Sequence, residues 1–350
     1  MRKSGHVSIT MLVVTLVMLL LLCACGDSNA QNGSVSPSEQ TEGRASSFQK
    51  AYREPIIPER AIPELPPELP TGILVMIDNY EPARPQSGID KADIVYEIIA
   101  EGGITRYMAL FYTQAAESIG PVRSARYYFV QLAKGMDLPY AHVGGSEDAL
   151  PLIGSLRIKD INEISNAQRY FWQDPSRRRP HATYTSTSYL MEAIDNKQYA
   201  YKVPDLPPLS RTFEGDPLPD PQINITYSSS YRVQWIWDES LGENGQYLRH
   251  INGKAQYTSD GVPMVADTII ILAALSTPRN TNPVTSAVNI IGGGDAMRIV
   301  EDTMNRGSWK KESAERPLFL YDHEDNPMSR KPGNTWIQVV DTLEVVSFGK

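Results

Sequence analysis

Four arginines in the first half of the chain lie close in sequence to acidic residues, and together they could bind an anion. The arginines are Arg84, Arg106, Arg123 and Arg126, and the acids are Asp78, Glu97 and Glu101. Guanidinium groups form paired hydrogen bonds with carboxylates and phosphates. Two interpretations follow: a salt-bridge network that fixes loops, or an open pocket for a carboxylate or phosphate ligand.

Arg123 and Arg126 stand at the start of a predicted amphipathic helix within residues 119–135. The free amide groups at a helix start carry partial positive charge, which repels cations. Ser124 between the two arginines is the predicted N-cap. A bound anion would offset the repulsion, so this helix start is the predicted centre of the anion pocket.

His181 ends the basic run Arg177-Arg178-Arg179-Pro180-His181. A carboxylate that orients the imidazole would let it act as a general acid or base, and the run could add to the anion site. The alternative is a solvated basic loop with a structural histidine.

Other motifs exclude several chemistries. Residues 142–148 run from a strand through two glycines, but they lack the spacing of a nucleotide-binding loop and favour a helix cap at Ser146. The histidines show no metal-binding spacing, and residues 322–326 are typical of a turn rather than a calcium loop. Trp235 and its neighbours predict core packing rather than sugar stacking. The sequence predicts no cofactor, no metal and no assigned catalytic residue.

The N-terminus predicts a lipoprotein signal peptide over residues 1–24. Arg2 and Lys3 precede an apolar run that closes on Leu22-Cys23-Ala24-Cys25. Leu22 and Ala24 fit the cleavage pattern before a lipidated Cys25, whereas Cys23 would be removed with the leader. The mature chain would then hold no second cysteine for a disulfide or a nucleophile. A diacylated Cys25 predicts an anchor on the extracytoplasmic face of the cell membrane.

Charge argues against a nucleic-acid partner. Removing the leader takes away two of the 33 basic residues and none of the 41 acidic ones, which leaves 31 against 41 and a formal charge of −10. An acidic surface repels nucleic acids and anionic wall polymers alike. Recognition of an anion therefore needs a local cluster of cations, and the arginines are the candidates.

Composition divides the mature chain into a tether and two domains. Residues 25–70 are first polar and then rich in proline, which predicts a disordered and semi-rigid tether after the lipidated cysteine. A second proline cluster predicts a linker over residues 203–222. Residues 71–202 and 223–350 are the predicted domains.

Apolar patterns predict an α/β (α+β) N-terminal domain with a mixed sheet and flanking helices, followed by a β-rich domain. The expected strands are residues 72–77, 94–99, 105–112 and 140–143 in the first domain and 231–237, 267–275, 317–321 and 335–340 in the second. Asn252-Gly253 predicts a hairpin turn. Residues 296–305 fit a helix or a strand equally well.

Several longer segments resemble the YerB-type lipoprotein family of Gram-positive bacteria. They are residues 83–88, 90–97, 101–106, 119–126 and 142–146 in the first domain and residues 307–311 and 332–339 in the second. The resemblance implies an α/β first domain, a β-containing second domain and a cell-envelope setting. It implies no settled reaction.

Two functions remain open on this evidence. The first is a non-catalytic lipoprotein that binds an anionic wall fragment or an envelope enzyme, with peptidoglycan or a peptidoglycan-synthesis protein as the expected partner. The second is an envelope hydrolase or transferase that uses Asp78, Glu97 or Glu101 together with His181 for acid–base chemistry.

Overall fold

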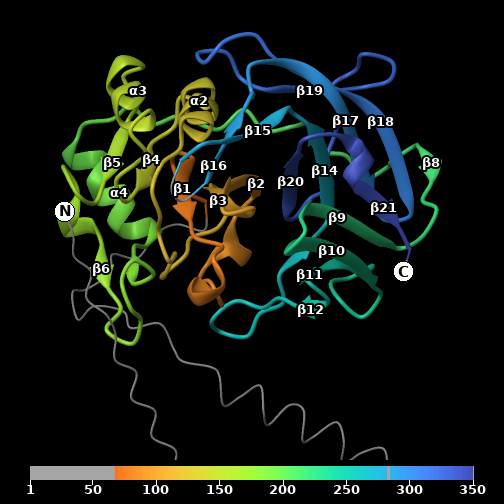
Figure 1. Cartoon of the computed structure of the whole chain (residues 1–350), viewed down its shortest axis with the longest axis horizontal. Coiled ribbons are helices and arrows are strands. Elements are labelled where there is room, and N and C mark those ends of the chain that lie inside the picture. Colours follow the sequence, from red (N-terminus) through yellow and green to blue (C-terminus); the bar gives the residue numbers. More distant parts are fainter. Residues whose placement is uncertain (1–67, 282–283, 350) are drawn as a thin grey trace, which may run out of the picture. The chain divides into compact units, whose positions relative to one another are not determined.

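Thirteen strands drawn from both ends of the chain form one mixed sheet. The computed structural model describes residues 68–281 and 284–349. We call residues 68–202 the N-terminal half and residues 223–349 the C-terminal half. The main path through the sheet has the order β19-β18-β17-β14-β20-β2-β3-β1-β4-β5 (Figure 1). Three further strands pair with this path or with one another: β8 and β16 join it, and β15 pairs with β16.

The N-terminal half contributes the strands at one end of this sheet and the α-helices. The strands are β1 (Ile73–Ile77), β2 (Ile94–Glu101), β3 (Ile104–Phe111), β4 (Tyr140–His142) and β5 (Asp160–Asn162). The helices are α2 (Tyr127–Met136), α3 (Ala149–Ser155) and α4 (Thr187–Asn196). A short pair, β6 (Trp172–Gln173) and β7 (Thr183–Tyr184), lies outside the large sheet.

The C-terminal half completes the large sheet and builds a second, antiparallel sheet. To the large sheet it gives β14 (Thr268–Ala273), β15 (Ser276–Arg279), β16 (Thr285–Val288), β17 (Gly292–Val300), β18 (Thr303–Lys311), β19 (Phe319–Asp322) and β20 (Thr335–Val340). The second sheet holds β9 (Gln222–Ser228), β10 (Tyr231–Asp238), β11 (Gln246–Ile251), β12 (Lys254–Ala255), β13 (Val265–Ala266) and β21 (Val346–Phe348). The linker adds β8 (Asp216–Pro217), which pairs with β18.

The two halves meet through backbone hydrogen bonding between β2 and β20. These strands are parallel, and Ile94 pairs with Thr335 while Ile98 pairs with Val339. Every residue of β20 is buried, as in strands covered on both faces. The large sheet therefore crosses the proline-rich linker of the sequence without a break.

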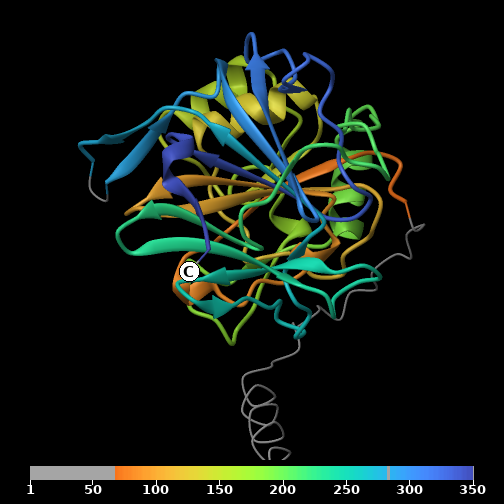
Figure 2. The same cartoon turned by 90° about the vertical axis from the view of Figure 1, so that its right-hand side faces the viewer.

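Two apolar cores lie on opposite faces of the large sheet. One core contains side chains of β1, β3, α4 and the second sheet, and the other contains side chains of α2, α3 and the remaining face of β1, β14 and β20. Figure 2 shows the yellow-green helices α2 and α3 above the large sheet and the teal strands of the second sheet below it. Alternation along the strands explains this division, because successive side chains point to opposite faces.

These elements confirm the predicted fold class, a mixed sheet with helices followed by a β-rich segment. The hairpin at Asn252-Gly253 is also confirmed, and both residues have positive φ values of 50° and 79°, as a type I′ turn requires. Residues 296–305, which the sequence left ambiguous, form parts of the antiparallel strands β17 and β18. Their pairing with β14 and β8, and with each other, selects the strand conformation.

Both predicted helix caps are wrong in detail. The N-cap of α2 is Arg126 rather than Ser124, and it makes no side-chain cap hydrogen bond. The N-cap of α3 is Asp148, and Ser146 contributes its backbone carbonyl to Ala149 and Leu150 instead of its hydroxyl. In both loops, residues 123–125 and 143–146 bond to each other, which displaces the helix starts toward the C-terminus.

A buried lysine at the end of β18 makes stability depend on pH. Nζ of Lys311 donates to the carbonyls of Ala314 and Arg316, and burial lowers the Lys311 pKa from 10.5 to about 8. The unfolded chain keeps this proton up to about pH 10.5, whereas the folded chain releases it near pH 8. Unfolding therefore takes up a proton between these values, and the free energy of unfolding rises with pH.

From pH 7.5 to pH 10, we expect the unfolding free energy of the wild type to rise by about 2–3 kcal/mol relative to that of Lys311→Met. Urea unfolding at a series of pH values measures it, and the tyrosines contribute equally to both proteins. Lys310→Met, which removes the exposed neighbour paired with Glu312, is the control, and the wild type should show no such rise relative to it. A difference that stays constant with pH would contradict the prediction.

Candidate functional site

Three loops converge at the end of β1. The segment after β1 begins with Asp78, whose amide donates to the carbonyl of Pro121 at 2.9 Å. Residues 119–123 run between this segment and β7, because Val122 donates to Thr183 at 2.7 Å and Arg123 donates to Met76 at 3.0 Å. The basic run that ends in His181 immediately precedes β7. Side chains that are far apart in sequence therefore meet beside Asp78.

The buried carboxylate of Asp78 contacts the side chains of Arg123 and His181. Its Oδ2 atom lies 2.6 Å from Nδ1 of His181 and 3.0 Å from Nε of Arg123, and its Oδ1 accepts a hydrogen bond from the amide of Tyr80. The Tyr80 ring stacks on His181 with centroids 5.6 Å apart. We call Asp78, Tyr80, Arg123 and His181 the Asp78 cluster.

The outer nitrogens of the Asp78 cluster are open. Among the described residues, neither terminal nitrogen of Arg123 nor Nε2 of His181 has a hydrogen-bond partner, and the two side chains are 22% and 12% exposed. Arg123 Nε is buried and forms an ion pair without hydrogen-bond geometry. Burial lowers the Arg123 pKa, Asp78 opposes that change and Arg106 adds to it. The guanidinium stays charged at neutral pH.

Arg106 and Arg126 belong to a different group, in which Glu101 binds both. Arg106 lies 2.8 Å from one carboxylate oxygen of Glu101 and donates to the carbonyl of Ser124 at 2.8 Å. Arg126 pairs with the other oxygen and donates to the carbonyl of Ala125. Glu101 therefore supplies a negative charge beside Arg126 at the start of α2, whereas Arg123 pairs with Asp78.

Burial lowers the pKa values of both arginines of the Glu101 group, and nearby charged or titratable groups oppose the change. Their terminal nitrogens are largely taken by Glu101 and by backbone carbonyls. Arg106 and Arg126 thus hold the β2–β3 hairpin against the start of α2.

Glu97 lies in neither group, because it forms a fully buried pair with Arg249 of β11. Its Oε1 atom is 2.8 Å from Arg249 and also accepts from Tyr231 and Thr105. Although burial alone would lower the Arg249 pKa, the charge of Glu97 raises it. The Arg249 guanidinium lies over the ring of Trp336, 4.7 Å from its centroid. The pair joins the large sheet to the second sheet.

Arg249 was not predicted from the sequence, although β11 carried a signal. Alternation along this strand buries Tyr247, Arg249 and Ile251 together. An arginine at an inward position of an alternating strand needs a buried acid as partner. The pattern indicates that such a partner exists but not which residue it is.

Arg84 links the Asp78 cluster to the Glu97–Arg249 pair. It donates to the side chain and the backbone carbonyl of Asn79, at 3.2 and 2.7 Å, and lies above the Tyr231 ring. Asn79 in turn donates to Thr105. The predicted residues therefore fall into three adjoining groups. In the Asp78 cluster, the terminal nitrogens of Arg123 and Nε2 of His181 have no hydrogen-bond partner among the described residues.

Of the three arginines before His181, one forms hydrogen bonds with the backbone and the other two are exposed. Arg177 donates to the carbonyls of Ala83 and Pro85 at 2.9 and 2.7 Å. Arg178 and Arg179 are exposed, and no ion pair joins them to other described residues. They add positive charge to the loop that carries His181.

Other predicted features are structural. His142 is buried between the carbonyl of Gly144 and the carboxylate of Asp160. Trp235, Trp309 and Trp336 are buried in the cores, as predicted. Within residues 68–281 and 284–349, no group of three or more His, Cys, Asp or Glu side chains could hold a metal ion.

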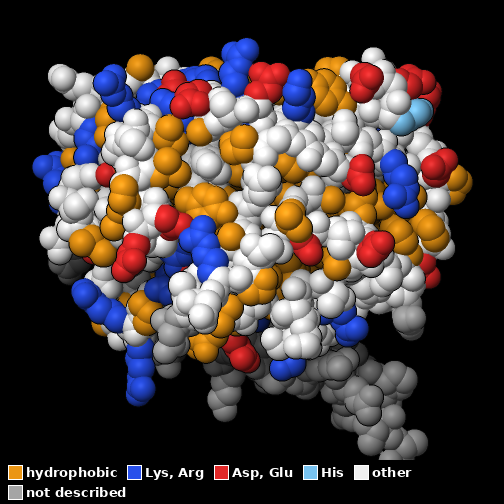
Figure 3. Space-filling view, turned by 45° about the horizontal axis from the view of Figure 1, so that its top comes forward, with side chains coloured by type: hydrophobic (Ala, Val, Ile, Leu, Met, Phe, Trp, Pro, Cys, Tyr) orange, Lys and Arg blue, Asp and Glu red, His pale blue; other side chains and the backbone are white. Residues whose placement is uncertain are grey.

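Three hollows of the described chain have no lining residue from the Asp78 cluster. Two of them, of about 570 and 770 Å³, lie on the C-terminal half, and a third of about 240 Å³ lies at the junction of the halves. On the face shown in Figure 3, acidic and basic side chains are interspersed.

No helix within the described residues has the length and apolar character needed to cross a membrane. Cys25 and the predicted signal peptide lie outside the described residues.

The fold and these ion pairs define a mostly β protein whose two segments share one sheet. Two family models match it: "Protein of unknown function (DUF3048) N-terminal domain" over residues 63–200 and the corresponding C-terminal domain over residues 223–337. The chain belongs to this DUF3048 family, which confirms the family resemblance predicted from the motifs.

A curated relative and a solved structure support this assignment. "Putative lipoprotein YerB" of Bacillus subtilis (strain 168) is 31% identical over 283 residues, which cover 79% of this chain and 83% of the relative. The crystal structure of the YerB protein from Bacillus subtilis matches with a TM-score of 0.70 and 28% identity, over 80% of this chain and 94% of that one.

Proposed function

We propose that the protein is a non-catalytic binding lipoprotein of the cell envelope, anchored through Cys25 on the extracytoplasmic face of the membrane. Its ligand is an anionic group of wall material, a phosphate or a carboxylate, bound at the Asp78 cluster. The lipobox before Cys25 supports the anchor, and the name of the Bacillus subtilis relative agrees with it. Peptidoglycan and its attached polymers carry such anionic groups.

The observation that carries this proposal is the orientation of donors by Asp78. The Asp78 carboxylate contacts Nε of Arg123 and Nδ1 of His181. The terminal nitrogens of Arg123 and Nε2 of His181 are therefore left to contact a ligand. Arg178 and Arg179 on the adjoining loop increase the local positive potential.

We expect Arg123→Met to weaken binding of purified wall polymer at least about tenfold, because charge-assisted hydrogen bonds contribute about 1.5–3 kcal/mol each. Arg126→Met should leave binding unchanged and instead lower the free energy of unfolding by about 1–3 kcal/mol, since Glu101 and Ala125 lose a partner. Calorimetric titration and urea unfolding measure the two effects separately.

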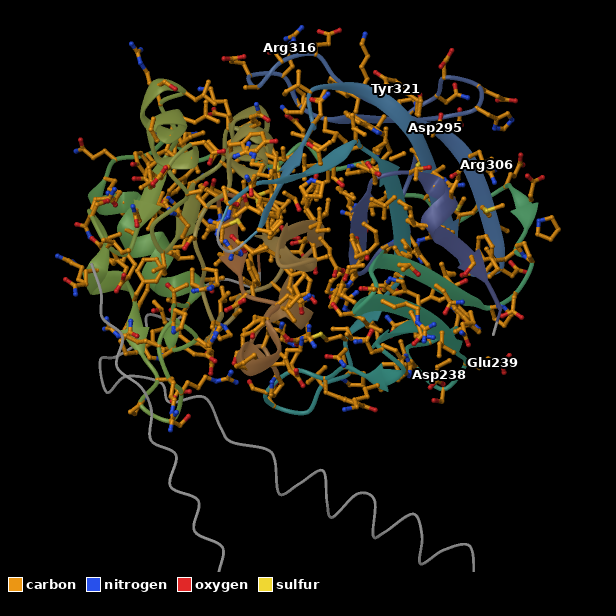
Figure 4. The ribbon with its side chains drawn as sticks, in the orientation of Figure 1. Asp238, Glu239, Asp295, Arg306, Arg316 and Tyr321 are labelled. Atoms are coloured by element: carbon orange, nitrogen blue, oxygen red, sulfur yellow. The ribbon has the colours of Figure 1, made fainter. Side chains whose placement is uncertain are left out.

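Arg316→Met is the matched control for charge. Arg316 is an exposed arginine on the segment after β18, labelled at the upper edge of Figure 4, and its ion pair with Glu312 is long, at 3.8 Å. Arg316→Met removes one positive charge, as Arg123→Met does, but outside the Asp78 cluster. It should change neither the binding of wall polymer nor the free energy of unfolding. Equal weakening by Arg123→Met and Arg316→Met would refute a specific site and indicate general charge attraction.

A second candidate function is hydrolysis or group transfer on wall material, and one observation favours it. Asp78 orients His181 at 2.6 Å and leaves Nε2 open, as in a carboxylate–histidine general base. Glu97 and Glu101, the other predicted acids, are both occupied by arginines. Chromatography of the titrated wall material distinguishes the two: a product that His181→Ala abolishes supports an enzyme, and binding without product supports a binder.

A further inference from the structure

A small apolar hollow lies where the two halves and the linker meet. It has a volume of about 240 Å³. Its walls come from β2, β3, the linker and the segment around β19, and they include Ile94, Tyr96, Leu110, Leu206, Leu318 and Met328. Since none of its lining residues is a lysine, arginine or histidine, the hollow is unsuited to the anion proposed for the Asp78 cluster.

A segment of the linker, residues 203–208, covers this hollow, and we call it the proline strap. At one end, Lys202 bonds through its amide to Thr71 and through Nζ to the carbonyl of Met136 at 2.7 Å. At the other end, the carbonyl of Pro208 accepts from Arg330 at 2.8 Å, and Ser210 donates to Arg330 at 2.9 Å. The strap is therefore fixed at both ends, and it spans from the N-terminal half to the C-terminal half.

The hydroxyl of Tyr96 is an unpaired polar group at this hollow. The Tyr96 side chain is 6% exposed, and its hydroxyl makes no hydrogen bond with any described residue. Two other tyrosines of the same core have partners: Tyr127 donates to Val288 at 2.7 Å and Tyr128 donates to Ile99 at 2.8 Å. The hydroxyl is not among the fully buried side-chain atoms that lack a partner, so it can be reached from the hollow and can donate to an acceptor atom of a bound molecule.

We infer that the hollow beneath the proline strap binds a small, uncharged, mostly apolar molecule that carries one carbonyl oxygen. The carbonyl accepts the hydrogen bond of Tyr96, and the rest of the molecule fills the space between Leu110, Leu206 and Met328. A cavity of about 150 Å³ holds benzene, so this hollow suits a guest of roughly ten non-hydrogen atoms.

A matched pair of small molecules tests the site in the whole protein. Acetophenone and isopropylbenzene have the same branching and the same number of non-hydrogen atoms, but only acetophenone has a carbonyl oxygen. We expect both to bind the wild type in titrations followed by NMR. Tyr96→Phe should weaken acetophenone about fivefold to tenfold, the value of one neutral hydrogen bond, and leave isopropylbenzene unchanged.

One variant in the strap and one beyond it separate occupancy of the hollow from effects on folding. Leu206→Trp fills the hollow and should abolish binding of both probes, whereas Leu209→Trp, at an exposed linker position beyond the strap, should leave both unaffected. Absence of binding to the wild type overturns the inference. If Tyr96→Phe changes the binding of acetophenone and isopropylbenzene equally, the proposed role of the hydroxyl is wrong. This site shares no residue with the Asp78 cluster, so either proposal can fail alone.

Discussion

Replacing Arg249 by methionine lowers the free energy of unfolding by about 3–5 kcal/mol, the cost expected when one partner of a buried ion pair is removed. Glu97 would keep only the hydroxyls of Tyr231 and Thr105 as donors to Oε1, and its Oε2 already has no partner among the described residues. The Glu97 carboxylate would then be a buried charge without a counter-ion. Urea unfolding at neutral pH measures the loss.

The double variant Glu97→Leu/Arg249→Met distinguishes a lost interaction from a stranded charge. Apolar side chains of similar size often replace a buried pair at little cost, so the double variant should recover most of the stability lost in Arg249→Met. Arg169→Met removes the exposed pair with Glu192 and should cost no more than about 1 kcal/mol. If Arg249→Met costs as little as this control, the pair does not hold the two sheets together.

Separating the halves is expected to abolish folding of both. Residues 68–202 alone would expose the edge of β2 that pairs with β20, and each apolar core would lose the side chains that the other half supplies. The full chain should show one cooperative urea transition, whereas residues 68–202 and residues 203–350 made separately should show none. Circular dichroism and the dispersion of amide NMR signals measure both outcomes.

Mixing the two halves provides the control for this experiment. If the shared sheet is the reason for failure, the fragments made together should recover the single transition of the full chain. A cooperative transition in residues 68–202 alone, at the midpoint of the full chain, would instead show that the N-terminal half is an independent domain, as its composition predicts.

Local patterns in the sequence predicted most strands, because side-chain alternation and buried apolar runs are properties of neighbouring residues. The register between strands was not predictable in this way. Nothing local indicates that Ile94 lies opposite Thr335, or that the last long strand of the chain inserts beside β2. Composition suggested a division at the linker, whereas the sheet order depends on contacts between distant residues.

The candidate site shows the same limit. The arginines and acids were visible as types, but the pairings join residues 103 positions apart in Asp78–His181 and 152 positions apart in Glu97–Arg249. Their proximity in sequence led us to predict that Arg123 and Arg126 share one pocket. They pair with different carboxylates, because Arg126 is the N-cap residue of α2 and its backbone is extended. Only the fold decides which donors remain open.

The place of β20 has a consequence for how the molecule is made. This strand lies inside the large sheet, between β14 and β2, but its residues 335–340 are translated after both of these neighbours. The edges of β14 and β2 stay unpaired until β20 has been made, and such edges favour aggregation. A premature stop codon before Thr335 would therefore remove the middle of the sheet rather than its margin.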